Sequence, residues 1–187
     1  MSYRQIYLKD VKPQAVREDI GERGRAVSST AGYSVVTLEP PTFETYYAQQ
    51  DEIVPLAEEL SRKLGALVFA AMNLEDDLLL FWVYDRGEQV FVYDSNPMYL
   101  GCPVCSYVSE RVKPEAGDIE RLARLFGHPE NARALRSWIY RKRGLGFLQE
   151  RQRHAEIARL LGLPLTPVEA PTCPAFASES GGEGPSR

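Results

Sequence analysis

The sequence predicts a single α+β domain built on an antiparallel sheet, and three observations favour this fold class. Two short apolar runs, residues 66–72 and 78–84, lack the polar face of an amphipathic helix and are too short to span a membrane. A turn at residues 85–88 leads into residues 89–93, which are rich in β-branched and aromatic side chains. From Asp118 onwards, apolar residues recur at helical spacing instead.

The segment before this block predicts two further strands and one clear helix. Residues 3–9 and 33–38 read as strands, and the prolines at 40 and 41 end the second one. Between them, the polar, glycine-containing residues 12–32 predict a short helix followed by a loop. A helix is expected from about Val54 to Leu64, with Pro55 in its first turn and Gly65 at its end. Phe43, Tyr46 and Tyr47 fit either a turn or a helix.

The C-terminal part predicts three helices after a long connection. Residues 94–117 contain several prolines and glycines and read as an irregular loop, which is typical of functional or mobile segments. Helices are expected over residues 118–126, from Pro129 to about residue 143, and over 147–161. The predicted architecture is therefore an antiparallel sheet of four to five strands with one preceding and three C-terminal helices. Residues 1–164 form the domain, and residues 165–187 form a disordered tail rich in proline, glycine and serine.

Charge and cysteine content restrict the class of protein further. Residues 1–120 carry 11 basic and 20 acidic side chains, a balance of −9, whereas residues 121–159 carry 10 basic and 3 acidic, a balance of +7. Such asymmetry indicates either a nucleic-acid face or two halves of one domain that attract each other. Three cysteines are an odd number, which argues against a disulfide framework and for a cytoplasmic location. The N-terminus lacks the features of a secretory signal.

A Cys-Pro-Val-Cys motif is the one spacing associated with metal or redox chemistry. Cys102 and Cys105 could chelate zinc or form a reducible disulfide, and His128 is the best-placed further ligand. Cys173 lies in the proline-rich tail and His154 in a helix needed for packing, so a four-ligand site is hard to assemble. We therefore expect two free thiols, no bound zinc and no cofactor.

Basic side chains gather near the end of the second C-terminal helix. Arg133, Arg136, Arg141 and Arg143 could contact phosphates, with aromatic residues between them to stack on bases. However, Trp138 falls on the apolar stripe of this helix, and cations near a helix C-terminus also complement the helix dipole. Nucleic-acid binding is thus an alternative function.

Catalysis has little support in the sequence. His154 lies on the inward side of the last helix, four residues after Glu150, and such a histidine is either a base paired with a carboxylate or a structural residue. Acidic residues at the strand turns are explained by the exposure of those turns. Phosphate-loop, dinucleotide-binding, nucleophile-elbow and metalloprotease motifs are all absent. Whether the protein is an enzyme is left open, with a non-enzymatic role favoured.

Two stretches resemble a loose group of uncharacterised bacterial proteins with no assigned function. The first is residues 77–99, an apolar hairpin followed by Ser-Asn-Pro-Met-Tyr, and the second is residues 147–164, with Arg153-His154 and Leu-Gly-Leu-Pro. The resemblance covers about residues 53–164 and implies the α+β fold without implying an activity. The Cys-Pro-Val-Cys insert and the tail depart from the pattern of this group.

These observations together predict a non-enzymatic protein-interaction domain. The expected binding surface is the loop over residues 94–117, with Ser95, Pro97 and Tyr99 as candidate contacts. The partner would be another protein. The alternatives are nucleic-acid binding by the basic helices and metal binding by the cysteine loop.

Overall fold

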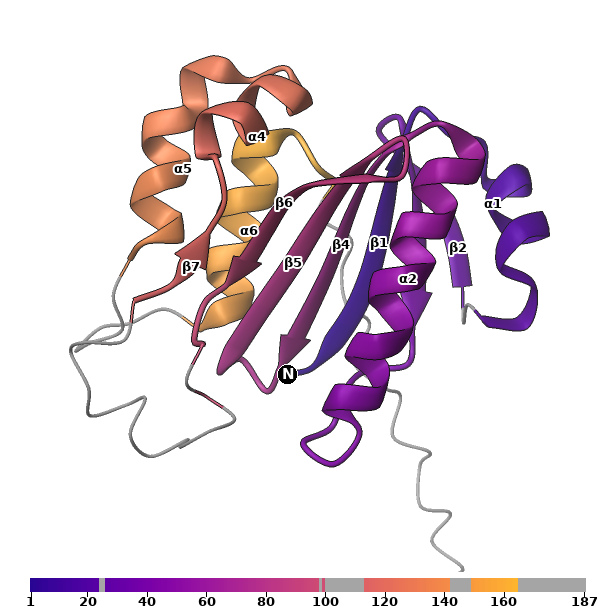
Figure 1. Ribbon diagram of the computed structural model, residues 1–187, viewed down its shortest axis with the longest axis horizontal. Helices are drawn as coiled ribbons and strands as arrows, with labels where there is room; N and C mark the ends of the chain where they lie inside the picture. The colour runs from indigo at the N-terminus through magenta and orange to yellow at the C-terminus, as the bar shows by residue number, and fades with distance from the viewer. Residues whose placement is uncertain (24–25, 98, 100–112, 142–148, 165–187) are drawn as a thin grey trace, which may run out of the picture.

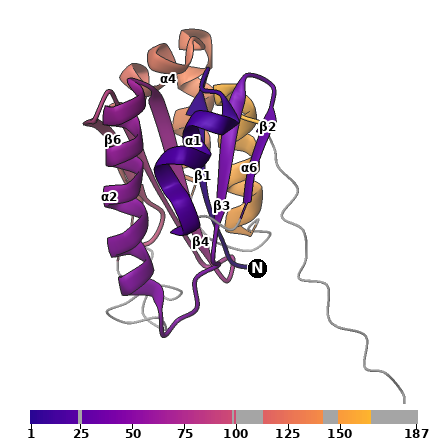
Figure 2. The ribbon, with the colours of Figure 1, turned by 90° about the vertical axis from the view of Figure 1, so that its right-hand side faces the viewer.

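A seven-stranded antiparallel sheet organises the protein, with helices on both of its faces (Figures 1 and 2). The computed structural model describes residues 1–23, 26–97, 99, 113–141 and 149–164. The strands follow the spatial order β2-β3-β1-β4-β5-β6-β7. The strands are β1 (Tyr3–Lys9), β2 (Ala26–Thr30), β3 (Tyr33–Leu38), β4 (Leu67–Leu74), β5 (Leu78–Asp85), β6 (Glu88–Asp94) and β7 (Glu115–Ala116). The helices are α1 (Pro13–Ile20), α2 (Tyr46–Leu64), α4 (Ile119–Phe126), α5 (Ala132–Ile139) and α6 (Glu150–Leu161).

Two hydrophobic cores lie on opposite faces of the sheet. One face packs against α1 and α2, and the other packs against α4, α5 and α6. Alternate residues of the central strands enter each core, as Val68 and Phe69 of β4 do. This cover on both faces accounts for the apolar runs of the sequence, since β4 and β5 are apolar apart from Asn73 and Asp85 near their ends.

Local signals place the turns and caps where the sequence predicts them. Arg86 and Gly87 have φ values of 52° and 85°, the left-handed pair that closes a tight hairpin between β5 and β6. A Cβ at Gly87 would lie 2.7 Å from the Cβ of Arg62, so the turn also packs closely against α2. Asp118 caps α4 by accepting a hydrogen bond from the backbone N–H of Arg121 at 2.9 Å.

Three elements differ from the prediction. β2 occupies residues expected to form a loop, because the left-handed turn at Ala31 and Gly32 folds this polar segment back onto β3. β7 lies within the long connection expected to be irregular, and it raises the strand count to seven. α2 begins at Tyr46, so Pro55 lies inside the helix. Burial of Ile53 and Leu56 on either side of Pro55 offsets the loss of the helical hydrogen bond that proline cannot donate.

The other C-terminal boundaries also shift slightly. Residues from Pro129 to Asn131 form a short 3-10 helix before α5, and α6 begins at Glu150. The predicted disordered tail, residues 165–187, lies outside the described residues. None of the described helices combines the length and apolar composition needed to cross a bilayer.

Candidate protein-interaction site

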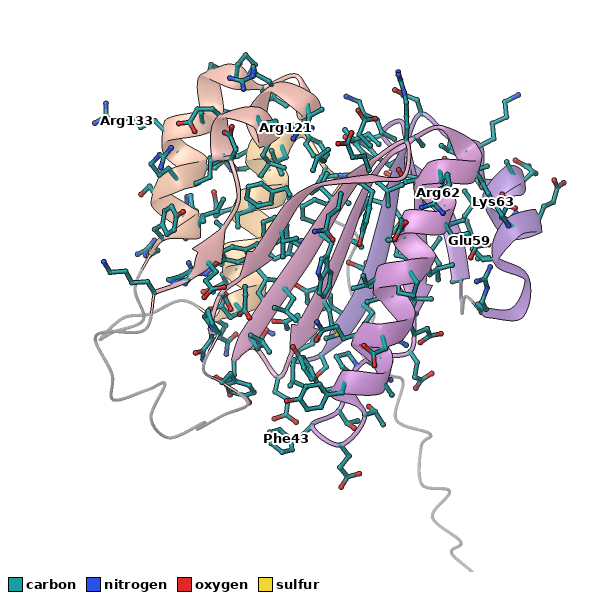
Figure 3. The ribbon with its side chains drawn as sticks, in the orientation of Figure 1. Phe43, Glu59, Arg62, Lys63, Arg121 and Arg133 are labelled. Atoms are coloured by element: carbon teal, nitrogen blue, oxygen red, sulfur yellow. The ribbon has the colours of Figure 1, made fainter. Side chains whose placement is uncertain are left out.

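Two aromatic side chains project from the protein at the N-terminal end of α2. Phe43 is 55% exposed and Tyr47 is 64% exposed, the highest values among the large hydrophobic residues described. Figure 3 shows Phe43 directed away from the body of the protein, beyond the end of the sheet. Glu44 and Asp51 are exposed beside them in the sequence, and Tyr47 and Asp51 share one helix face because they are four residues apart. An aromatic surface with carboxylates around it is thus presented to solvent.

Arg4, which is almost entirely buried, holds this part of the chain in place. Its Nε donates to the carbonyl of Glu39 at 2.6 Å, and its Nη1 donates to the carbonyl of Gln49 at 2.9 Å. The same Nη1 forms an ion pair with Glu52 at 2.6 Å. A single residue of β1 therefore ties down both the segment that precedes α2 and the first turns of that helix. Phe43 lies between these anchor points in the sequence, so Arg4 positions the exposed aromatic residues.

The aromatic residues continue into an acidic region at the end of β6. The ring of Tyr47 contacts that of Tyr46 edge-on, with the centroids 5.3 Å apart. Tyr46 is buried next to Asp94, and burial together with this negative charge raises the pKa of the Tyr46 hydroxyl. Asp94 pairs with Glu115 in the last rung between β6 and β7. We call the surface formed by Phe43, Tyr47, Asp94 and Glu115 the acidic aromatic surface.

The carboxyl of Asp94 has a raised pKa. Burial and the neighbouring charge of Glu115 raise the pKa of the Asp94 carboxyl to about 6, although the N–H of Asn96 donates to its Oδ1 at 2.7 Å. Two carboxylates on adjacent strands, one of them partly desolvated, favour the approach of a cation. A lysine or arginine of a partner would supply that charge.

An open groove of about 380 Å³ runs beside these carboxylates. Four consecutive residues of β6, Gln89 to Val92, form one side, and Glu115 to Gly117 form the other. Asp94 and Glu115 are the ionisable residues in its lining, and both are acidic. The groove therefore combines strand backbone, an exposed Val92 and negative charge.

Replacing Asp94 with Asn is expected to stabilise the protein at neutral pH. The carboxyl has a folded-state pKa of about 6, above its ordinary value of 3.8, so folding favours its protonated form. Its ionisation costs stability as the pH rises through 6, and Asn avoids this cost while keeping the acceptor for Asn96. We expect a gain of about 1–3 kcal/mol at pH 8 that disappears below about pH 4. Urea unfolding at pH 4, 6 and 8 measures it.

The exposed Glu88 of the same strand provides the control for this measurement. Glu88→Gln should stay within about 0.5 kcal/mol of the wild type at each pH, as expected for a surface substitution. Equal stability of Asp94→Asn and wild type at pH 8 would contradict the prediction.

The residues predicted as partner contacts lie elsewhere. Ser95 and Tyr99 are each 6% exposed, and Pro97 is half-buried. The Ser95 hydroxyl accepts the backbone N–H of Leu79 at 2.8 Å, and Tyr99 packs into the core beneath α2. The expectation that Ser95 and Tyr99 form an exposed surface is therefore wrong, because their side chains close the end of this core. Residues 100–112 of the same loop lie outside the described residues.

The predicted nucleic-acid residues are dispersed. Arg133 is exposed and projects from α5 (Figure 3), whereas Arg136 forms an ion pair with Glu120 at 2.6 Å. Arg141 lies over the Trp138 ring, with its guanidinium carbon 4.7 Å from the ring centroid. Arg143 lies outside the described residues. Trp138 packs against the core, in agreement with its place on the apolar stripe, and nucleic-acid binding stays a prediction.

The predicted metal ligands do not form a site within the part of the chain that the structure describes. Cys102, Cys105 and Cys173 lie outside the described residues. The Nδ1 of His128 lies 3.3 Å from the carboxylate of Glu130, near the start of the 3-10 helix. Within the described part of the chain, no group of three or more histidine, cysteine or acidic residues could hold a metal ion.

His154 is buried, as its position in the sequence indicated, but it does not pair with Glu150. Its Nδ1 lies 2.6 Å from the hydroxyl of Tyr3, and its ring stacks on Phe69 with the centroids 5.9 Å apart. Burial lowers the pKa of His154 to about 4, so the imidazole is neutral at pH 7. Glu150 instead forms an ion pair with Arg153 at 2.8 Å. This geometry is that of a structural histidine in an aromatic core.

The opposite end of α2 is also highly charged, but its charges neutralise one another. Glu59 forms ion pairs with Lys63 at 2.7 Å and Arg23 at 3.1 Å, and Lys63 also reaches Asp19 at 3.6 Å. Hydrogen bonds from Lys63 and Arg23 lower the pKa of Glu59 to about 2. Figure 3 shows Glu59 and Lys63 close together at this end. Such internally paired charges offer little to a partner.

Comparison with known proteins provides no further assignment. No family model, curated protein or solved structure matches this chain. The resemblance described from the sequence therefore remains a prediction.

Sequence reasoning did not select the residues of the acidic aromatic surface. Phe43 and Tyr47 were visible as aromatic residues in a polar stretch, outside the apolar stripe of the following helix. That position is a usable signal, because an aromatic residue away from the buried face is exposed. By contrast, nothing local indicates that Asp94 and Glu115 pair, since 20 residues separate them in the sequence.

Proposed function

We propose that this protein is a non-enzymatic protein-interaction domain that binds a basic segment of another protein at the acidic aromatic surface. The observation that carries the proposal is the exposure of Phe43 and Tyr47 together with the exposed carboxylates of Glu44 and Asp51. Aromatic side chains dominate the binding energy of many interfaces, because they bury a large area at a small cost in conformational entropy.

The charges of the surface determine the chemistry of the partner. Asp94 and Glu115 line the groove, and Glu44 and Asp51 flank the aromatic residues. Lysine or arginine in the partner would relieve the repulsion between these carboxylates and accelerate the encounter of the two proteins. The rigid sheet and the Arg4 anchor hold the surface in one conformation, which limits the entropy lost on binding.

A selection from a displayed library of random 12-residue peptides tests this function. We expect the wild-type protein to enrich peptides that combine lysine or arginine with apolar residues. The double variant Phe43→Ala/Tyr47→Ala should bind these peptides at least about tenfold more weakly, because both aromatic anchors are lost. Fluorescence anisotropy with the synthetic peptides gives the dissociation constants.

Tyr140→Ala provides the matched control for this test. Tyr140 is also an exposed aromatic residue, 39% exposed, but it lies at the end of α5 in the basic half of the chain. Its replacement should leave peptide affinity within twofold of the wild type. Enrichment of acidic peptides, or equal binding by the wild type and the Phe43→Ala/Tyr47→Ala variant, would overturn the proposal.

A further inference from the structure

The sheet has an incompletely paired edge at β6. β7 contributes two residues and pairs with Tyr93 and Asp94, and the N–H of Gly117 adds one bond to the carbonyl of Val92. Beyond that point the chain turns away towards α4 (Figure 1). Within the described residues, no strand pairs with the outer edge of β6 from Glu88 to Phe91.

The geometry of this edge suits an added strand. Four residues of a regular strand span about 13 Å, and in β6 this length is shortened by an irregularity at Val90, where Gln89 and Phe91 lie opposite the adjacent residues Tyr84 and Val83. The groove of about 380 Å³ lies along this part of β6, so solvent reaches the strand where β7 has ended. β7 already pairs with β6 in antiparallel register, and a second extended segment could continue in line with it. Unpaired strand edges bind extended peptides through main-chain hydrogen bonds.

Close packing prevents the chain itself from filling the groove at its junction with β7. A Cβ at Gly117 would lie 3.1 Å from the ring of Phe91, so the backbone of residue 117 packs directly on that side chain. The chain then enters α4 at Ile119, whose side chain belongs to the same core as Phe91. The groove is therefore a fixed feature of how β7 joins α4.

The charge of the groove restricts the occupant. Asp94 and Glu115 stand at the end where β7 begins, and no basic residue lines the groove among those that the structure describes. Val92, which is 36% exposed, adds an apolar contact between the carboxylates and the free part of the edge. In an added strand, alternate side chains would face these groups. A strand with lysine or arginine at one position and a β-branched residue two positions further along would match the carboxylates and Val92.

We infer that the basic segment of the partner binds as an extended strand, which pairs with β6 from Glu88 to Phe91 and directs a lysine or arginine towards Asp94 and Glu115. This inference rests on the proposed function, because it names how the same partner is bound. It adds a binding mode, main-chain pairing, to the aromatic contacts at Phe43 and Tyr47.

The other edge of the sheet does not offer the same chemistry. β2 is exposed along most of its length, but its sequence, Ala-Val-Ser-Ser-Thr, carries no charge. Arg17 from α1 donates to the carbonyl of Val27 at 2.9 Å, which covers part of that strand. A basic extended segment is therefore expected at β6.

The test uses the full-length protein and an acetylated, amidated heptapeptide of sequence Val-Lys-Val-Thr-Val-Lys-Val. In ¹H–¹⁵N spectra of the labelled protein, amide shifts on titration should concentrate in β6 and at residues 115–117. A second peptide that is N-methylated at every residue keeps the charge but has no backbone N–H left to donate to β6. It should bind at least tenfold more weakly. Replacing both lysines by glutamate should also weaken binding at least tenfold.

Protein variants separate the charge contribution from the aromatic one. Asp94→Asn combined with Glu115→Gln should weaken heptapeptide binding at least fivefold, whereas Tyr140→Ala should leave it unchanged. Equal affinity for the methylated and unmethylated peptides would overturn strand pairing. Suppose that the two peptides bound equally, but the Phe43→Ala/Tyr47→Ala variant bound the selected library peptides much more weakly than the wild type did. The proposed function would then stand without this binding mode.

A second copy of the chain is the competing occupant of this edge. Sedimentation of the protein without peptide should show a monomer. A dimer that Val92→Lys dissociates would assign the β6 edge to self-association and overturn the inference.

Discussion

Arg153→Met is expected to lower the free energy of unfolding by about 3–5 kcal/mol, the range found when one member of a buried ion pair is removed. Arg153 is 2% exposed and its partner Glu150 is fully buried. The substitution retains most of the aliphatic volume but removes the positive charge that lies 2.8 Å from the Glu150 carboxylate. Glu150 would then keep its negative charge in the interior without this counter-ion.

The hydrogen bonds of Arg153 add to this effect. Its Nη1 donates to the carbonyls of Trp138 and Ile139 at 2.6 and 3.0 Å, and its Nη2 donates to that of Arg141 at 2.8 Å. These carbonyls lie at the C-terminus of α5, where a helix leaves its last carbonyl groups without internal partners. Arg153 therefore joins α6 to the end of α5, and Met would remove its hydrogen bonds to these carbonyls, although that of Ile139 would keep the hydroxyl of Tyr93 as a donor.

Urea unfolding monitored by circular dichroism measures the loss. Arg151→Met is the matched control, because Arg151 lies two residues away on α6, is 45% exposed, and reaches Asp76 at 3.6 Å. Asp76 is buried but also pairs with the N-terminal amine at 3.1 Å, so removal of the longer, half-exposed contact with Arg151 should cost about 0–1 kcal/mol. A loss below 1 kcal/mol for Arg153→Met would show that α5 and α6 are held together by their apolar contacts alone.

Arg4→Met is expected to cost about 2–4 kcal/mol, because it removes several hydrogen bonds donated by one buried charged group. The lost acceptors are the carbonyls of Glu39 and Gln49 and the carboxylate of Glu52. The substitution should lower the stability of the whole protein and should destabilise the start of α2 in particular. Hydrogen exchange of the amides from Tyr46 to Glu52 should accelerate more than that of the β4 amides, since Arg4 secures the start of α2.

Arg17→Met provides the comparison for this variant. Arg17 is an exposed arginine with one hydrogen bond, to the carbonyl of Val27. Its replacement should change stability by less than about 0.5 kcal/mol. Arg4→Met should also weaken binding of the selected basic peptides, because Phe43 and Tyr47 would lose their fixed position. Unchanged exchange at the start of α2 would contradict the anchoring role of Arg4.

The centre of the fold follows from local patterns in the amino-acid sequence. The apolar runs of β4 and β5 have no polar face, which requires cover on both sides of the sheet, and the structure places α2 and α6 there. The turn at Arg86 and Gly87 and the cap at Asp118 depend on backbone preferences of a few adjacent residues. Short-range chemistry of this kind can be read from the chain directly.

The edges of the sheet and the residues of the site depend on long-range packing. β2 and β7 are too short or too polar to show strand periodicity, and each becomes a strand because a neighbouring strand supplies its hydrogen bonds. The burial of Tyr99 likewise depends on packing beneath α2. The pairing of Asp94 with Glu115, and the anchoring of α2 by Arg4, join residues far apart in the sequence. Such contacts depend on which surfaces meet after folding. Desolvation and charge act through space, so the spacing of residues along the chain does not indicate them.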